Sequence, residues 1–461
     1  PRVRQLPLGQ LPLRISDACT LLKEIEREGE TFTTTAAPPR WLLEGIFTRG
    51  CYPSIKHLAG VIASPTIRPD GSILQLPGYD ESTRLVYTST QDFPPAPDNP
   101  TRDDAKAAGN LLMEVVRDFP FIAEGDKSAW LSLVLTLVGR HAFGGCAPMF
   151  AITATTPGSG KGMLADAACI VAYGRPSPRK PYSPSDDEQR KAITATAIEA
   201  LPSVLLDNVD CVLGGAALDA ALTATVWSDR VLGSSKTTGE LSLSTTWMAT
   251  GNNLRFGADL ARRVLPIRLA PSTDKPEERT DFEHPDLLAW IREHRPQLAI
   301  AALTILRAYF VAGRPVQTGG AWGSFENWSA TIRGALVWAG FADPLITRET
   351  AQSDDQSGAI VKGLIGGLLE VDETGEGVTA REIIDLISDP SNVGRFPTMR
   401  EVVAEVATDK GKLNQKKLGY TLRKFRGRIV DSWQIGGKPN RNGVVAWTSI
   451  NLAGNVGDIG D

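Results

Sequence analysis

The stretch that decides the fold reads Ala154-Thr-Thr-Pro-Gly-Ser-Gly-Lys-Gly-Met163. It follows the apolar run Met149–Ala154, which predicts a strand, and it opens Gly162–Val171, which predicts a helix. A glycine-rich turn in this place lets backbone N–H groups and the helix amino terminus face a phosphate. The segment therefore predicts a nucleotide-binding P-loop, and the alternative is an ordinary tight turn.

The loop matches the pattern G-x-x-x-x-G-K-[ST] incompletely. Thr155 replaces the first Gly, and Gly162 replaces the Ser or Thr whose hydroxyl normally ligates Mg²⁺. Lys161 is placed to reach the β- and γ-phosphates, and we expect ATP and Mg²⁺ as cofactors. The residues expected to contact the nucleotide are Thr156, Pro157, Gly158, Ser159, Gly160, Lys161, Gly162 and Met163.

Strands and helices alternate around the loop. The runs Ser203–Leu206, Thr245–Ala249 and Val264–Leu269 predict strands, and Asp187–Ala200 and Ala216–Trp227 predict helices. This alternation is typical of an α/β fold with a parallel sheet.

A carboxylate follows the first of these strands. Asp207 is expected at the carboxyl edge of the sheet, where it can hold Mg²⁺; the alternative is a strand that ends at an Asp-Asn turn. The next residue, Asn208, stands where many ATPases have a Glu that polarises the attacking water, and it is a catalytic candidate by that position. Since Asn cannot accept a proton, Asp210 and Glu188 are candidate substitutes.

Two further motifs follow at strand ends. Asn252 ends a predicted strand and is expected near the γ-phosphate and its water, whereas Gly-Asn as a plain turn is the alternative. Arg262 and Arg263 precede the last strand. They are either surface charge or, in a ring ATPase, arginine fingers that reach the neighbouring subunit's γ-phosphate.

This order of motifs resembles that of AAA+ ATPases, in particular the superfamily-3-like helicase part of phage, plasmid and poxvirus-type primase-helicases. In that family the Asn is a sensor and the arginines act between subunits, roles that fall by position on Asn252 and on Arg262 or Arg263. The resemblance is best over about residues 110–345 and implies an AAA+ core in a homo-oligomeric, hexameric ring. Gly162 and Asn208 depart from the family pattern, and both departures concern hydrolysis more than binding.

Two segments are expected to contact DNA. The resemblance implies that Lys236, on a predicted hairpin at Ser234–Glu240, grips single-stranded DNA in the ring's pore. Residues 410–441 contain ten Lys or Arg and one acid. They belong to a unit whose helix–helix–helix–strand–strand pattern, over residues 380–449, predicts a winged helix with Gln415–Arg426 as recognition helix. In both cases the alternative is a solvated charged surface. The predicted DNA-contacting residues are Lys236, Lys416, Lys417, Arg423, Lys424, Arg426, Arg428, Lys438 and Arg441.

Length and composition fit a multidomain globular protein, with 461 residues of which 42% are hydrophobic and 22% charged. We expect a β-rich amino-terminal region (1–100), a helical linker (101–145), the AAA+ core (146–275), a helical subdomain (276–375) and the winged helix (376–461). Leu131–Val138, the best candidate for a membrane span, is stopped by Gly139, Arg140 and His141, so a buried core helix is predicted and no membrane association is expected.

The remaining features bear on location and completeness. Five scattered cysteines and four histidines argue against a zinc site or a disulfide framework and fit a reducing cytoplasm, in a bacterial or infected host cell. The chain starts at Pro1 without a Met, so we expect processing or a trimmed fragment with missing upstream domains. A primase domain or protein is a candidate partner.

The sequence thus predicts an ATP-dependent DNA helicase or translocase of a mobile element, acting on single-stranded and duplex DNA in phage or plasmid replication. The main alternative is an ATP-gated DNA-binding initiator or loader in which Gly162 and Asn208 have slowed hydrolysis. A small-molecule kinase is a third reading, against which the basic carboxyl-terminal unit argues.

Overall fold

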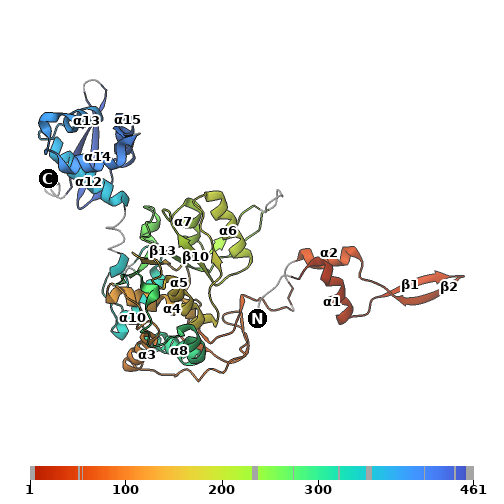
Figure 1. Cartoon of the computed structure of the whole chain (residues 1–461). Helices are drawn as coiled ribbons and strands as arrows, with labels where there is room; N and C mark the ends of the chain where they lie inside the picture. Colours follow the sequence, from red (N-terminus) through yellow and green to blue (C-terminus); the bar gives the residue numbers. More distant parts are fainter. Residues whose placement is uncertain are drawn as a thin grey trace, which may run out of the picture.

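Within the described residues, a five-stranded parallel sheet forms the centre of the protein (Figure 1). The computed structural model describes residues 6–49, 52–53, 55–230, 237–271, 273, 275–319, 322–348, 356–409, 411–440 and 443–452. The strands are β8 (Met149–Ala154), β9 (Arg179–Lys180), β10 (Ser203–Val209), β13 (Thr246–Asn252) and β14 (Val264–Leu269). Their order is β14-β8-β13-β10-β9, and all neighbours are parallel, which confirms the predicted α/β sheet.

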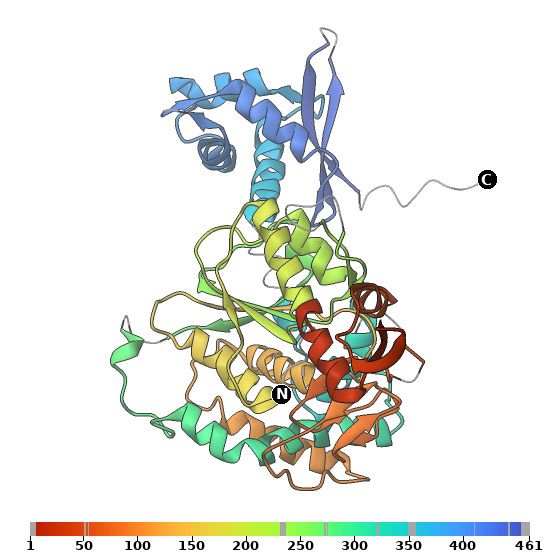
Figure 2. The same cartoon turned by 90° about the vertical axis from the view of Figure 1, so that its right-hand side faces the viewer.

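Both faces of this sheet are buried, which explains its nearly continuous apolar strands. On β8, Phe150 and Ile152 join a core with α4, α5 and α8, whereas Met149 and Ala151 join a second core with α6 and α7. Figure 2 shows the sheet between these helices. The covering helices are α4 (Glu124–Val138), α5 (Lys161–Tyr173), α6 (Asp186–Ile198), α7 (Ala216–Thr223) and α8 (Leu287–Val311).

The first core continues into the flanking helices. Helix α4 is almost wholly buried, as predicted for Leu131–Val138, and no helix in the described part of the chain is long and apolar enough to cross a membrane. Asp126 of α4 accepts hydrogen bonds from the Arg268 guanidinium at 2.9 and 3.1 Å, which fixes α4 to β14. The other helices here are α3 (Arg102–Glu114), η2 (Leu260–Arg262), η3 (Pro276–Glu278), α9 (Glu326–Trp328), η4 (Ser329–Arg333) and α10 (Gly334–Ala339).

One helix prediction was too long. Helix α7 ends at Thr223, and Val226–Trp227 is strand β11, which pairs antiparallel with β12 (Leu241–Ser242). Ala224 is already extended, and the β-branched residues around it favour a strand. The predicted hairpin tip lies between these two strands, and Lys236 lies outside the described residues.

The amino-terminal region is less β-rich than expected, because residues 40–49 form helix α2 rather than strands. Residues 6–49 project from the α/β core as two helices and an exposed hairpin (Figure 1). Their elements are η1 (Leu8–Gln10), α1 (Leu11–Ala18), β1 (Leu22–Arg27), β2 (Glu30–Thr35) and α2 (Arg40–Arg49). Short strands follow: β3 (Gly60–Ile62), β4 (Thr66–Ile67), β5 (Ile73–Leu74), β6 (Gly78–Asp80) and β7 (Leu85–Tyr87).

The carboxyl-terminal unit has a hydrophobic core of its own, which includes Met399, Leu418, Leu422 and Trp447. Figure 2 shows it standing apart from the α/β core, with the β19–β20 hairpin along one side. The order of helices and strands follows the predicted pattern, and its assignment as a winged helix stays a prediction. The helices are α12 (Gln356–Val371), α13 (Ala380–Ser388), η5 (Pro390–Asn392), α14 (Pro397–Ala407) and α15 (Gln415–Lys424). The strands are β15 (Val378–Thr379), β16 (Thr408–Asp409), β17 (Lys412–Leu413), β18 (Ile429–Val430), β19 (Trp433–Pro439) and β20 (Val445–Asn451).

Candidate nucleotide site and nucleic-acid interface

The predicted P-loop is a loop between β8 and α5 with two left-handed glycines. Gly158 and Gly160 have φ values of 72° and 77°, which glycine adopts without strain. Gly160 caps α5, and its carbonyl accepts a hydrogen bond from Leu164 N at 2.9 Å. Because the first N–H groups of a helix have no partner within it, the loop and the start of α5 offer donors suited to a phosphate.

Lys161 and Asn252 meet at the mouth of this loop. Strand β13 lies beside β8, with Asn252 in register with Ala154, so the end of β13 lies next to the loop. Lys161 Nζ donates to Asn252 Oδ1 at 2.7 Å and to Thr156 O at 3.3 Å. Burial lowers the pKa of the Lys161 ammonium below its ordinary value. The structure thus brings together two residues that the sequence placed in one site.

Asp207 lies at the same edge of the sheet, but its carboxylate is engaged. Its Oδ1 accepts a hydrogen bond from Thr250 Oγ1 at 2.6 Å, and its Oδ2 accepts one from Arg179 Nε at 2.9 Å. Asn208 has a left-handed φ of 54°, an exposed side chain, and an N–H that donates to Thr250 Oγ1 at 3.0 Å. Thr250 was missed by the sequence analysis, although its spacing of two residues from Asn252 on a strand was a usable signal.

Arg179 was also missed. Besides Asp207, it contacts Asp166 of α5, whose Oδ2 accepts from Arg179 Nη2 at 2.7 Å. The hydrogen bond with Asp166 is the main cause that raises the pKa of Arg179. A Cβ on Gly162 would lie 3.6 Å from Nη2, so the guanidinium lies beside the position of the missing hydroxyl. Strand β9 has two residues only, and no sequence pattern marks Arg179.

These residues do not fit a magnesium site. Mg²⁺ requires a near-octahedral set of oxygen ligands. Gly162 has no hydroxyl, and both carboxylate oxygens of Asp207 accept hydrogen bonds, one of them from a guanidinium. The Mg²⁺-binding role predicted for Asp207 would therefore require its carboxylate to give up the hydrogen bonds from Thr250 and Arg179.

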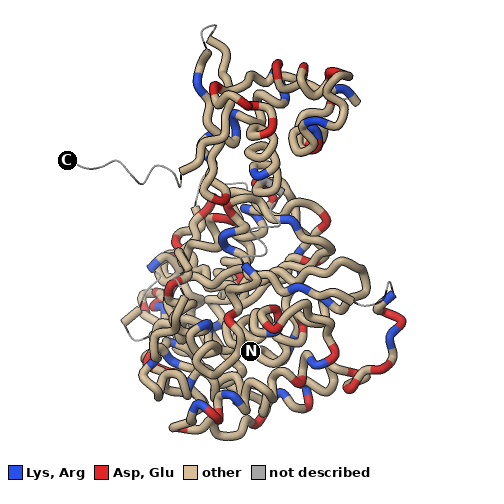
Figure 3. Tube along the Cα trace, turned by 90° about the vertical axis from the view of Figure 1, so that its left-hand side faces the viewer, with Lys and Arg blue, Asp and Glu red and all other residues tan. Residues whose placement is uncertain are grey.

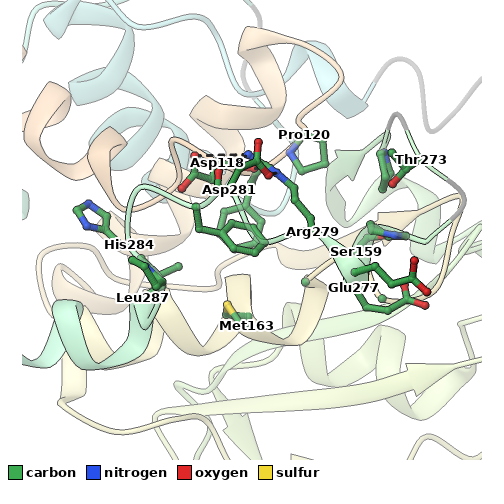
Figure 4. A pocket seen from close by; sticks show the side chains of 18 of the residues that line it. Asp118, Pro120, Ser159, Met163, Thr273, Glu277, Arg279, Asp281, His284 and Leu287 are labelled. Atoms are coloured by element: carbon green, nitrogen blue, oxygen red, sulfur yellow. Dashed lines mark hydrogen bonds and ion pairs between the residues drawn. The ribbon is translucent and has the colours of Figure 1, made fainter.

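A pocket of about 1130 Å³ opens beside the loop (Figure 4). One wall is Gly158–Gly160 with Met163 of α5, and the opposite wall is the segment before α8. Phe119 and Phe282 supply apolar surface, and the Arg279 guanidinium lies 4.8 Å from the centre of the Phe282 ring. The volume is sufficient for a nucleotide-sized ligand.

The same pocket carries an acidic side chain close to the loop. Glu277 lies directly against Gly158, and Figure 4 shows it next to Ser159. Its neighbour Glu278 also lines the pocket, but its carboxylate pairs with Lys275 at 2.7 Å. A carboxylate against the loop opposes the approach of a phosphate, because like charges repel.

Arg262 and Arg263 are in different environments. Arg263 Nη1 donates to Asp219 Oδ1 of α7 at 2.9 Å, and the two side chains are 27% and 19% exposed. Arg262 contacts Asp259 at 2.5 Å, and both side chains are more than 60% exposed. Arg263 is therefore paired within the α/β core, whereas the pair of Arg262 with Asp259 lies in solvent.

The basic residues of α15 lie on its outer side. Leu418, Gly419 and Leu422 face the core, whereas Lys416, Lys417, Arg423 and Lys424 are exposed, as are Arg426 and Lys438. Tyr420, which is 70% exposed, lies between Lys416 and Lys424 at helical spacing, and the sequence analysis missed it. Arg428 is half-buried near the Phe425 ring. Lys236 and Arg441 lie outside the described residues.

Positions of Lys and Arg and positions of Asp and Glu are interspersed along the trace of the α/β core (Figure 3). Residues 411–440 differ, since Asp431 is the one acid in that stretch of the sequence. The Asp431 carboxylate is paired with Lys362 of α12 at 2.8 Å. Within residues 411–440, the basic side chains of α15 therefore have no further acid beside them in the sequence.

No family model and no curated protein matches the sequence. Among solved structures, the apo C-terminal region of NrS-1 is similar at a TM-score of 0.39 and 12% identity, covering 93% of both chains. The SCCmec type IV Cch active helicase is similar at 0.35 and 10% identity, covering 94% of this chain and 93% of that one. The JCV helicase is similar at 0.24 and 13% identity, covering 55% and 74%. At these TM-scores the likenesses are distant and assign no family, so the function has to follow from the chemistry of the site.

Proposed function

We propose that this chain is an ATP-dependent DNA helicase or translocase of a mobile element, working as a homo-hexameric ring. The observation that carries the proposal is the loop at Thr155–Gly160, whose lysine is held by Asn252 on the neighbouring strand. A half-buried lysine at the mouth of the loop is not required for a structural turn. A lysine ammonium at the mouth of a glycine-rich loop is suited to binding a phosphate.

The proposed binding mode uses both sides of the loop. The triphosphate would take the N–H groups at the start of α5 and the Lys161 ammonium. The base would enter the adjacent pocket, where Phe119, Phe282 and Met163 offer apolar contacts. When Lys161 turns to the phosphates it releases the Asn252 amide, which can then orient water near the γ-phosphate.

Arg262 is the residue that we propose to act on a neighbouring subunit. Breaking its exposed pair with Asp259 costs about 0–1 kcal/mol, so a phosphate on another subunit can compete for it. Arg263 is proposed to be structural. The test is mixing: inactive Lys161→Ala subunits combined with inactive Arg262→Ala subunits should recover part of the activity, because each supplies the half-site that the other lacks. Mixed oligomers that form and stay inactive would refute the shared site.

The carboxyl-terminal unit is proposed to be a winged helix that binds duplex DNA through α15. Lys416 and Lys424 would neutralise phosphates and release counterions, and Tyr420 between them offers a ring for stacking or sugar contact. The outward position of these side chains, with Leu418 and Leu422 holding the inner face, supports this assignment.

The experiment that tests the nucleotide site is Lys161→Ala, with Lys127→Ala as control. Lys127 is an exposed lysine whose partner, Glu124, lies within the same helix. Binding of a fluorescent ATP analogue and phosphate release should be lost in the first variant and kept in the second, with the thermal unfolding of both unchanged. Turnover at the parent rate in folded Lys161→Ala would remove the assignment.

A second function, an ATP-gated DNA-binding initiator or loader, is favoured by one specific observation. Neither Gly162 nor Asn208 supplies hydrolytic chemistry, and Asp207 is paired with Arg179. Measuring turnover with and without single-stranded DNA separates the two. Stimulated turnover with fork unwinding supports the helicase, and nucleotide-dependent DNA binding with slow, unstimulated turnover supports the initiator.

A further inference from the structure

We propose that Arg179 takes the place of the metal ion at this site, so that its guanidinium, rather than Mg²⁺ held by Asp207, balances the charge of the bound phosphates. The proposal rests on the nucleotide-binding function proposed for the loop. It makes Arg179 a phosphate-binding residue supplied by the same subunit.

The position of Arg179 is the first argument. Its guanidinium spans the gap between α5 and β10, with Nη2 on Asp166 at 2.7 Å and Nε on Asp207 at 2.9 Å. These are the helix that begins with Lys161 and the strand that contains the predicted metal ligand, Asp207. A cation therefore already lies where the sequence pattern places Mg²⁺.

The second argument concerns Gly162, which stands where the P-loop pattern has the hydroxyl of a Ser or Thr. The Cα of Gly162 faces Arg179, and an added Cβ would be 3.6 Å from Nη2. A Ser or Thr here would extend its hydroxyl towards the guanidinium. The guanidinium of Arg179 therefore lies within van der Waals range of the position from which the hydroxyl of the P-loop pattern would extend.

The third argument is that Arg179 is held in place. Asp166 is buried, and among the described residues its Oδ1 has no hydrogen-bond partner, so Arg179 supplies the neutralising charge for this carboxylate. If the arginine swung out to admit a metal, a buried carboxylate would be left unpaired, which is strongly unfavourable. The Oδ2 of Asp207 is also occupied by Arg179 Nε, so a metal ion at this oxygen would have to displace that hydrogen bond.

Arg179 nevertheless retains donors for a ligand. A guanidinium has five N–H bonds, and the structure uses two of them, on Asp166 and Asp207, which leaves three. Guanidinium N–H groups match phosphate oxygens in geometry and in charge. The side chain is 44% exposed, so an incoming phosphate can reach it.

The test measures the Kd of the full chain for a fluorescent ATP analogue, in excess Mg²⁺ and in excess EDTA. We expect the two Kd values to agree within about threefold, because a hydrogen-bonded arginine is unaffected by chelation. Binding that disappears in EDTA overturns this proposal and leaves the nucleotide site standing. Absence of binding in both buffers overturns the proposed function itself.

Variants assign the effect to Arg179. Arg179→Gln should weaken binding in EDTA by about tenfold to a hundredfold, the loss expected for a hydrogen bond to a charged group. The control Arg175→Gln, an exposed arginine in the same α5–β9 connection, should bind as the parent does. If Arg179→Gln does not fold, Arg179→Lys keeps a cation between the two carboxylates and should weaken binding in the same sense. Parent affinity in a folded Arg179 variant refutes the assignment.

A double variant reverses the proposed exchange. Gly162→Ser combined with Arg179→Gln restores the hydroxyl of the P-loop pattern and frees Asp207 from its cation. Its nucleotide binding should now require Mg²⁺ and should be lost in EDTA. Equal binding of this double variant in the two buffers would overturn the proposal.

Discussion

Replacing Arg263 by Ala should destabilise the α/β core, whereas the same change at the adjacent Arg262 should not. Arg263 joins the start of β14 to Asp219 of α7 through a 2.9 Å hydrogen bond between side chains that are 27% and 19% exposed. The Arg262 pair with Asp259 lies in solvent, at 67% and 63% exposure. Two neighbouring arginines with similar sequence context therefore have different structural roles.

The magnitude follows from what each substitution leaves behind. Arg263→Ala leaves the Asp219 carboxylate half-enclosed without its cation, and a buried charge that loses its partner costs about 3–5 kcal/mol. Because water still reaches part of Asp219, we expect a loss of about 1–2 kcal/mol in the free energy of unfolding. Arg262→Ala removes an exposed pair worth about 0–1 kcal/mol and should change stability little.

The loss at Arg263 should depend on pH. Burial raises the pKa of Asp219, and attraction by Arg263 opposes this, so the pKa rises further in Arg263→Ala. An acid whose pKa is higher in the folded than in the unfolded protein binds more protons when folded, so stability falls as pH rises through that window. The deficit of the variant should therefore be full at neutral pH and shrink as pH falls towards the ordinary carboxyl range, about 4.

The assay is urea unfolding followed by tryptophan fluorescence, at neutral pH and near pH 5, for the parent, the two arginine variants and Asp219→Asn/Arg263→Ala. The double variant should recover much of the loss, because an amide leaves no unpaired charge. Equal midpoints for Arg262→Ala and Arg263→Ala, or a deficit that grows on acidification, would refute the reasoning.

Three further predictions concern binding. Glu277→Gln should lower the Kd for a fluorescent ATP analogue by about threefold to tenfold, since a charge near 4 Å in water is worth about 1 kcal/mol. Glu278→Gln should leave this Kd unchanged. Equal effects of the two substitutions would exclude a role of the contact between Glu277 and Gly158. Removing residues 376–461 should weaken duplex binding at low salt and spare basal ATP hydrolysis, and equal duplex affinity by fluorescence anisotropy would contradict the DNA role of α15. Lys236→Ala should abolish DNA-stimulated hydrolysis and fork unwinding with nucleotide binding unchanged, and unwinding at the parent rate would return this lysine to the solvated surface.

The sequence was sufficient for the architecture of the α/β core. Runs such as Met149–Ala154 are bounded by turn-forming residues and must be buried on both faces, so their position and the parallel order of elements follow from local pattern. The loop between that strand and α5 was equally visible, because its glycines and lysine are contiguous. The helix at residues 40–49 could not be predicted from the sequence, since it is only weakly amphipathic and none of its side chains is buried.

The same sequence determined which residue types the candidate site contains, and placed Lys161, Asp207 and Asn252 at one edge of the sheet. It could do so because the carboxyl ends of parallel strands share an edge whatever the details of packing. It also showed, by Gly162, that a metal-binding hydroxyl is missing.

Only the tertiary structure decided which side chain lies beside Gly162 and which of the two arginines pairs with Asp219. Arg179 comes from a two-residue strand at the edge of the sheet, and it reaches Asp166 and Asp207 only because β9 pairs with β10 next to α5. Likewise, Arg263 rather than Arg262 forms an ion pair with Asp219 because of where α7 places this carboxylate. Such pairings join residues distant in sequence through side-chain geometry, and no local pattern carries that information.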